Sequence, residues 1–181
     1  MTRAYRRLRP LTASTHLPHE THPVLSRSSF TPFCHAVLSR STVTDVPWLE
    51  PTLSNAPPEH AARLRVAMHA ALAAGHCVMN HFHHGVTASD KADGSPVTQA
   101  DLEAETSIRN AITDAFPDDA QLGEENGARN TTSDWRWVID PIDGTVSFIH
   151  GVPVFGTLIG IEYQGTPVAG VMHFPGLDET V

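Results

Sequence analysis

The stretch WVIDPIDGT, residues 137–145, carries more structural information than any other part of this chain. Its apolar start, Trp137–Ile139, favours a buried β-strand, and Pro141 predicts that strand pairing ends there, because proline has no N–H group and a fixed φ. Asp140 and Asp143 follow the apolar run. Two carboxylates at a strand end are costly to bury unless a cation pairs with them, and such oxygen ligands suit Mg²⁺, Mn²⁺ or Ca²⁺. The stretch therefore predicts a strand that leads into a metal site.

Two further segments extend this pattern. KADGSPVTQAD occupies residues 91–101, and GEENG occupies residues 123–127. Together with DPIDGT at residues 140–145, and in this order, they resemble the signature segments of the inositol monophosphatase superfamily of Mg²⁺-dependent phosphatases. The resemblance covers roughly residues 57–181. It implies an α+β fold, namely the N-terminal half of the layered αβαβα sugar-phosphatase architecture, with the second α/β domain missing.

The resemblance also implies a set of metal ligands. In the family, the residues that match Glu124, Asp140 and the main-chain carbonyl of Ile142 bind one Mg²⁺ ion. Those that match Asp140 and Asp143 bind a second, and the complete enzymes hold two or three ions. Glu125 is the neighbouring candidate for the glutamate ligand, and it ranks below Glu124 only on the family alignment.

Catalytic and substrate-binding roles follow from the same resemblance. The residue that matches Glu124 helps to position the attacking water, and the pair that matches Asp101 and Thr145 forms a hydrogen-bonded relay to that water. Asp143, Gly144 and Thr145 match the residues around the substrate phosphate. Taken alone, an acidic pair in a turn is often only solvated, and Asp101 could be an ordinary acid at a helix N-terminus.

The role of Lys91 stays open from the sequence. It could face the phosphate, contact the neighbouring loop, or be an exposed lysine. The family's second domain supplies a Trp-Asp motif whose aspartate ligates the second metal, and no such motif follows before Val181. We therefore expect the chain to be a fragment in which the first metal site is complete and the second lacks a ligand.

The predicted function is Mg²⁺-dependent hydrolysis of a small phosphate monoester. Residues 91–98 and 151–162 look more like the histidinol-phosphatase branch, which favours histidinol phosphate, an intermediate of histidine biosynthesis, as the substrate. Inositol 1-phosphate, fructose 1,6-bisphosphate and adenosine 3′,5′-bisphosphate are the alternatives within the superfamily. A hypothesis of another class is a truncated, non-catalytic protein that binds metal or a partner.

Composition excludes several other classes. The net charge of −8 argues against nucleic-acid binding, and no apolar run approaches the roughly 20 residues of a membrane span. The two cysteines, Cys34 and Cys77, are too few for a disulfide framework and are typical of free thiols in a reducing compartment. We expect a cytoplasmic protein with a small phosphorylated substrate as its partner, and a homodimer is compatible with that expectation.

The first part of the chain differs from the rest. Residues 1–55 are rich in Ser, Thr, Pro and His and have no sustained apolar period. We interpret them as a disordered extension or leader, and their Arg-rich, acid-poor start also resembles an organelle transit peptide. Residues 56–181 would then form the metal-binding domain.

Within that domain, apolar periodicity predicts helices over residues 59–83 and 99–115, the second with a core stripe of Leu102, Ile108, Ala111 and Ile112. Strands are predicted at residues 135–140, 154–163 and 168–174, the last two as a hairpin.

Four histidines gather near the end of the first predicted helix. A cluster such as His81, His83 and His84, with His76 one turn earlier, invites a zinc hypothesis. We favour the alternative that these histidines complement the helix dipole, because we find no Cys or carboxylate partner at ligand spacing in the sequence.

Overall fold

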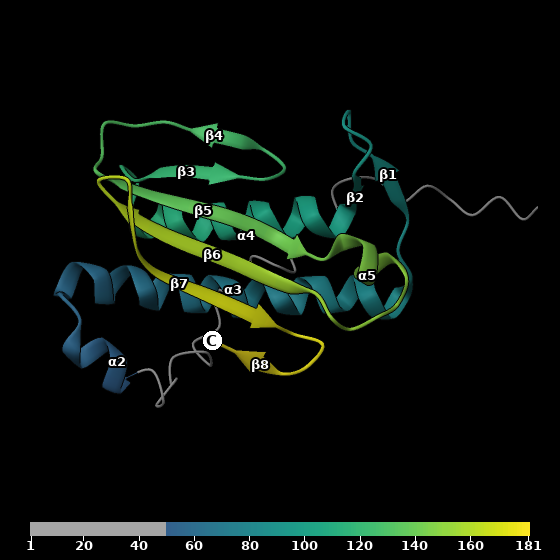
Figure 1. Cartoon of the computed structure of the whole chain (residues 1–181), viewed down its shortest axis with the longest axis horizontal. Helices are drawn as coiled ribbons and strands as arrows, with labels where there is room; N and C mark the ends of the chain where they lie inside the picture. Colours follow the sequence, from purple (N-terminus) through teal and green to yellow (C-terminus); the bar gives the residue numbers. More distant parts are fainter. Residues whose placement is uncertain (1–49) are drawn as a thin grey trace, which may run out of the picture.

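The computed structural model of this protein describes residues 50–181 (Figure 1). Four helices and eight strands lie in this part of the chain. In chain order they are α2 (Glu50–Asn55), α3 (Pro58–His84), β1 (Ala88–Asp90), β2 (Pro96–Thr98), α4 (Gln99–Ala115), β3 (Ala120–Gly123), β4 (Gly127–Arg129), β5 (Trp135–Asp143), α5 (Thr145–Ile149), β6 (Gly156–Tyr163), β7 (Thr166–Phe174) and β8 (Glu179–Thr180).

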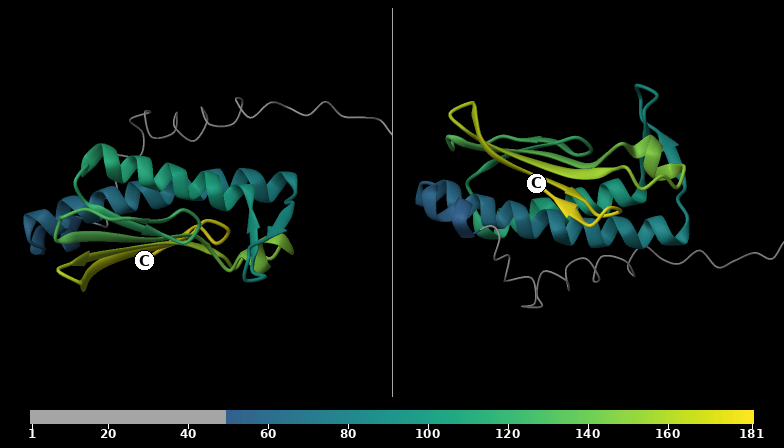
Figure 2. Two further views of the ribbon diagram at one scale, coloured as in Figure 1. Left: turned by 90° about the horizontal axis from the view of Figure 1, so that it is seen from above. Right: turned by 60° about the horizontal axis from the view of Figure 1, so that its bottom comes forward.

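Six of the strands form one sheet in the order β4-β3-β5-β6-β7-β8. Only β3 and β5 run parallel, and the other neighbours are antiparallel. The long helices α3 and α4 lie side by side on one face of this sheet (Figures 1 and 2). β1 and β2 form a separate hairpin beside α5, at the end of the sheet where β5 terminates (Figure 1). No helix within residues 50–181 covers the opposite face of the sheet (Figure 2).

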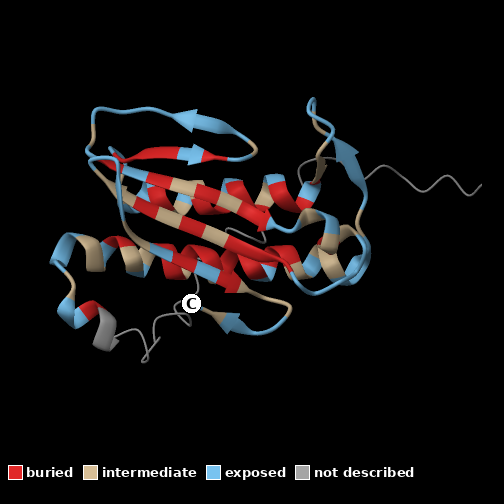
Figure 3. Ribbon diagram, in the orientation of Figure 1, coloured by how far each residue is buried: buried red, intermediate tan, exposed pale blue. Residues whose placement is uncertain are grey.

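The core lies between the two helices and the sheet (Figure 3). Side chains alternate along β5, so that Trp135, Trp137 and Ile139 are buried while Arg136 is exposed. On β6 the same alternation buries Ile159. The small residues of α3 let the helix approach the sheet closely; they include the buried alanines 67, 70, 71, 73 and 74.

A buried ion pair fixes the start of α3 to the turn before β3. Arg63 donates two hydrogen bonds to Asp119, at 2.8 and 3.0 Å, and the indole N–H of Trp137 donates a third at 2.9 Å. The Arg63 guanidinium also lies over the rings of Phe116 and Trp135. All these polar groups are paired, which is the condition under which a buried charge is tolerated.

The predicted helices and the predicted hairpin are present, and three expectations need correction. β5 does not end at Pro141: pairing with β6 is interrupted between Asp140 and Asp143 and resumes at Asp143, in the manner of a β-bulge. Leu102 is 38% exposed, so it does not belong to the core stripe of α4. Residues 50–55 form α2, whose Leu53 is 4% exposed within the core, so the folded part begins before residue 56.

The rest of the predicted extension, residues 1–49, lies outside the described residues.

Candidate active site

Two of the predicted metal ligands meet at the end of β5. The N–H of Glu124 donates to the carbonyl of Ile139 at 3.1 Å, which holds the loop after β3 beside the last residues of β5. The side chains of Glu124 and Asp140 are thereby brought into hydrogen-bonding contact. Since both are acids, one of them must hold a proton for this contact to be favourable unless a cation lies between them.

Asp140 is the most perturbed of these carboxyls. Burial, the charge and hydrogen bond of Glu124 and the charge of Asp143 raise its pKa to about 7. Its Oδ1 atom is buried and has no hydrogen-bond partner in the described part of the chain. A buried oxygen without a partner is rare in folded proteins and is expected where an ion or a water binds.

Lys91 lies beside Glu124 and the next residue, Glu125. Its ammonium group donates to Glu124 Oε1 at 2.6 Å and contacts Glu125 Oε1 at 2.8 Å. Burial alone would lower the pKa of Lys91, but its hydrogen bonds to the two glutamates and their charges outweigh that effect and raise its pKa. Of the three alternatives left open for Lys91, the structure shows a contact with the neighbouring loop, through Glu124 and Glu125.

These groups fit a divalent cation. Glu124 and Asp140 supply carboxylate oxygens from two chain segments, and the unpaired Asp140 oxygen supplies a site that the protein itself does not satisfy. Hard oxygen ligands of this kind favour Mg²⁺ over softer metals. Asp143 is exposed, and its charge contributes to the raised pKa of Asp140, so it faces the same region.

A second cluster connects α4 to the turn after β5. Asp101 is 1% exposed, and its Oδ2 accepts hydrogen bonds from the N–H and the hydroxyl of Thr98, at 2.8 and 2.6 Å. The Thr145 hydroxyl lies 3.5 Å from Asp101 Oδ1 and 3.0 Å from the carbonyl of Ile142, and it donates its single proton to one of them at a time. Burial raises the pKa of Asp101, although the hydrogen bonds from Thr98 oppose this shift.

Gly144 forms the turn between β5 and α5. Its φ of 88° lies in the left-handed region, and an added Cβ would lie 3.2 Å from the carbonyl oxygen of Val154. A side chain at this position would therefore be both strained and crowded. On one side of this glycine, the charge of Asp143 acts on Asp140, and on the other side the Thr145 hydroxyl contacts Asp101.

Glu105 is a residue of this region that the sequence did not single out. It is fully buried on α4, and its carboxylate accepts hydrogen bonds from the backbone N–H groups of Glu125 and Asn126, at 2.7 and 3.1 Å. Arg109 donates to it at 2.7 Å. A Cβ at Gly123 would overlap this carboxyl, so the glycine permits the approach. The sequence did offer one signal: Glu105 lies four residues after Asp101 on the same predicted helix, and therefore on the same face.

One exclusion made from the sequence is wrong. His81 does have a thiol and a carboxylate within ligand spacing, because Cys77 lies one turn earlier on α3 and Glu103 lies on the facing helix α4. Spacing along the chain could show Cys77, four residues away, but not Glu103, because the packing of α3 against α4 brings that residue close.

Comparison with known proteins gives consistent results. Residues 60–181 match the model of the inositol monophosphatase family. A histidinol-phosphatase from Chlorobaculum parvum is 44% identical over 117 residues, which cover 64% of this chain and 45% of that protein. An inositol-1-monophosphatase from Mesorhizobium japonicum is 40% identical over 122 residues, covering 66% of this chain and 46% of that protein.

Among solved structures, the extragenic suppressor protein suhB from Bartonella henselae superimposes with a TM-score of 0.63 at 36% identity, over 66% of this chain and 47% of that one. The chain thus spans less than half the length of these relatives. Within residues 50–181, no helix is long and apolar enough to cross a membrane.

Proposed function

The chain belongs to the inositol monophosphatase family, and from this premise we propose that it carries the metal-binding half of a Mg²⁺-dependent phosphatase for small phosphate monoesters. The family match covers residues 60–181, which include every site residue named from the sequence. Because the chain spans less than half of its relatives, the activity proposed here is that of the whole protein.

One observation supports this proposal most directly. Asp140 holds a buried oxygen without a partner next to Glu124, and its pKa is raised to about 7. A purely structural carboxylate would be paired or exposed. A carboxyl pair that is unfavourable without a cation is the arrangement expected of a metal site.

The residues that would hold the metal are Glu124, Asp140 and the carbonyl of Ile142, with Asp143 contributing to a second ion. When bound, divalent metal neutralises the phosphate charge, favours an ionised water and stabilises the leaving oxygen. In the overall reaction a water oxygen bonds to phosphorus, the bond from phosphorus to the ester oxygen breaks, and that oxygen takes up a proton.

Asp101 and Thr145 would orient the attacking water. When Thr145 donates its proton to Asp101 Oδ1 and not to the Ile142 carbonyl, a lone pair of the hydroxyl oxygen is free to accept a hydrogen bond from water. Thr98 holds the other oxygen of Asp101, so the carboxyl cannot rotate away. Gly144 and Thr145 would contact the phosphate from the turn after β5.

For the substrate we propose histidinol phosphate. Residues 91–98 and 151–162 favour that branch, and a histidinol-phosphatase and an inositol-1-monophosphatase both stand among the relatives. Inositol 1-phosphate is therefore the main alternative, ahead of fructose 1,6-bisphosphate and adenosine 3′,5′-bisphosphate.

The test measures phosphate release by the whole protein from a panel of these four substrates, with Mg²⁺ and with EDTA. We expect Mg²⁺-dependent release, fastest with histidinol phosphate. Release that persists in EDTA would reject the metal mechanism, and a preference for inositol 1-phosphate would overturn only the substrate. Mg²⁺ binding without release from any substrate would favour a non-catalytic, metal-binding protein.

Asp140→Asn provides the corresponding binding test. Removing the charge of a direct ligand should weaken Mg²⁺ binding at least about 10-fold, since even residues that only orient a ligand cost that much. Isothermal titration would compare the variant with Asp114→Asn, which makes the same charge change at an exposed site on α4. Equal Mg²⁺ affinity in the two variants would refute the assignment of Asp140.

A further inference from the structure

A second candidate metal site lies between α3 and α4, away from the carboxylates of β5. Cys77 and His81 are four residues apart on α3 and therefore project from the same face of that helix. Glu103 faces them from α4. One ligand atom from each residue lies within 4.8 Å of the others, and within residues 50–181 this is the group that meets such a spacing.

The contacts converge on one oxygen atom. Glu103 Oε2 lies 2.9 Å from His81 Nε2 and 4.0 Å from the Cys77 sulfur. Around a tetrahedral Zn²⁺ ion, bond lengths of about 2.0–2.3 Å place neighbouring ligand atoms roughly 3.3–3.6 Å apart. The two distances that end at Glu103 Oε2 thus differ from these values by about half an ångström, and the ligand atoms of Cys77 and His81 lie within 4.8 Å of each other. Rotation of the side chains can bring the three atoms to the separations that an ion requires.

The surroundings support the ligand geometry. Gln99 donates to the other oxygen of Glu103 at 3.0 Å, which fixes the carboxylate and leaves Oε2 directed toward α3. Partners of this kind orient metal ligands in known sites. Cys77 is 5% exposed, and the side chains of His81 and Glu103 are 21% and 16% exposed, so the group is shielded without being closed.

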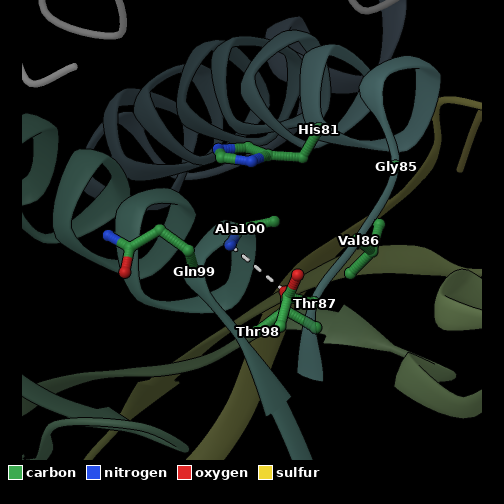
Figure 4. A pocket seen from close by; sticks show the side chains of 7 residues that line it. All are labelled: His81, Gly85, Val86, Thr87, Thr98, Gln99 and Ala100. Atoms are coloured by element: carbon green, nitrogen blue, oxygen red, sulfur yellow. Dashed lines mark hydrogen bonds between the residues drawn. The ribbon is translucent and has the colours of Figure 1, made fainter. Parts of the chain in front are cut away.

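An access path leads to His81. A pocket of about 200 Å³ opens beside it, between the end of α3 and the start of α4 (Figure 4). This volume holds several water molecules. In Figure 4 the His81 ring extends from α3 toward Gln99 and Ala100, with Val86 and Thr87 on the connection that follows α3. A water in this pocket could supply the fourth ligand.

We propose that Cys77, His81 and Glu103 form a three-residue binding site for Zn²⁺, with its fourth position open to this pocket. A thiolate and an imidazole are soft and borderline ligands, which favour Zn²⁺ and disfavour Mg²⁺. The site is therefore chemically distinct from the oxygen cluster at Asp140. Occupancy would tie the last turns of α3 to the N-terminal part of α4, the helix that also carries Asp101.

Co²⁺ titration provides the test, because a thiolate bound to Co²⁺ gives a charge-transfer absorption that carboxylates do not. The full chain is used with Cys34→Ser, so that Cys77 is its only thiol, and with saturating Mg²⁺ to occupy the oxygen cluster. We expect the absorption to appear with one equivalent of Co²⁺ and to disappear when Zn²⁺ is added. Absence of the absorption in this protein would overturn the proposal without affecting the proposed phosphatase site.

Three variants in the Cys34→Ser background complete the experiment. Cys77→Ser should abolish the absorption, and His81→Asn should weaken Co²⁺ binding at least about 10-fold. His83→Asn is the matched control, because it removes an exposed histidine from the same helix end outside the group, and it should bind Co²⁺ as the parent does. Equal loss in His81→Asn and His83→Asn would overturn the assigned ligands even if Cys77→Ser fails to fold.

Discussion

Asp101 and Asp140 show how two carboxyls of one candidate site acquire different surroundings. The pKa of each is raised by burial, but Thr98 satisfies one oxygen of Asp101, whereas Asp140 Oδ1 has no partner in the described part of the chain. The first arrangement holds the Asp101 carboxyl in one orientation, as the proposed relay requires. The second leaves an oxygen available for the proposed metal. Both residues are aspartates, so the difference arises from the groups that each carboxyl contacts.

Thr145→Ala tests the role of the hydroxyl that lies between Asp101 and the Ile142 carbonyl. Its oxygen contacts Asp101 and the Ile142 carbonyl, and we do not expect it to ligate the metal. The variant should therefore lower kcat by about 100-fold, the lower range for a lost proton-transfer partner, while Mg²⁺ affinity changes less than about threefold. Steady-state kinetics and Mg²⁺ titration of the same preparations measure both quantities.

Thr145→Ser is the control, since it keeps the hydroxyl and should retain most of the turnover. If Thr145→Ala lost Mg²⁺ affinity and turnover in equal measure, the hydroxyl would belong to the metal shell and the proposed relay would be wrong.

At the scale of elements, α4 positions the loop between β3 and β4. The buried carboxylate of Glu105 accepts from the N–H groups of Glu125 and Asn126, directly after Glu124, the proposed metal ligand. The helix therefore holds Asp101 at its first turn and, one turn later, the loop that carries Glu124. The relative placement of these two site residues depends on a single rigid helix.

Glu105→Gln should disturb this arrangement. The amide retains one acceptor oxygen but directs an NH₂ group toward donors, at an estimated cost of about 2–3 kcal/mol in unfolding free energy. Because the loop then loosens, Mg²⁺ affinity should fall although Glu105 is not a ligand. Urea unfolding and Mg²⁺ titration measure the two effects.

Thr106→Ala, the exposed neighbour whose hydroxyl bonds only to the Leu102 carbonyl, serves as the control and should change neither quantity appreciably. A Glu105→Gln protein that is destabilised but binds Mg²⁺ normally would show that Glu105 supports the fold and not the site.

The elements also show what the sequence could and could not predict. The helix at residues 99–115 was predicted with the bounds that α4 has, because local signals define its ends: Thr98 and Asp101 form a capping box, and Pro117 follows. Its buried face was predicted in part, since Ile108 and Ile112 are buried and Ala111 packs against the core. Leu102, however, is exposed, and Glu105 is buried because it accepts hydrogen bonds from the loop between β3 and β4, a contact that periodicity along the helix cannot detect.

The short strands β1, β4 and β8 were not predicted either, because each is defined by its pairing with another strand and not by a local sequence pattern. The β6–β7 turn contains two residues, Gln164 and Gly165, both with positive φ. A two-residue turn of this kind matches the twist of paired strands. At the site, the sequence indicated the carboxylates through the family resemblance. It could not show that Lys91 lies between two glutamates, nor that Glu103 meets His81.

For the molecule as a whole, the carboxylate cluster makes stability depend on pH in an unusual direction. Ordinary paired acids have lowered pKa values and stabilise a fold above pH 4. Here the pKa of Asp140 is raised to about 7, and those of Asp101 and Glu125 are raised as well, each with burial as its main cause. A raised pKa means that the fold binds a proton that the unfolded chain releases.

Without metal, Asp140 therefore contributes fully to the free energy of unfolding below its ordinary pKa of 3.8, and this contribution is lost as the pH rises toward 7. Since the carboxyl is partly exposed, we discount the full shift and expect a loss of about 1–2 kcal/mol between pH 4 and 7.5. Asp140→Asn carries no titrating group at this position. In EDTA the variant should gain stability relative to the parent protein as the pH rises, and it should be the more stable of the two at pH 7.5.

Saturating Mg²⁺ should reverse that order at pH 7.5, because the ion binds the ionised carboxylate and stabilises only the parent protein. Urea unfolding of both proteins at several pH values, with EDTA and with Mg²⁺, measures the differences. Comparison between the two proteins removes the opposite contribution of His173, whose pKa is lowered mainly by burial and whose effect on stability both share. If the unfolding free energies of the two proteins changed in parallel with pH in EDTA, Asp140 would already be ionised in the metal-free fold. The unfavourable contact that we assign to Glu124 and Asp140 would then be absent.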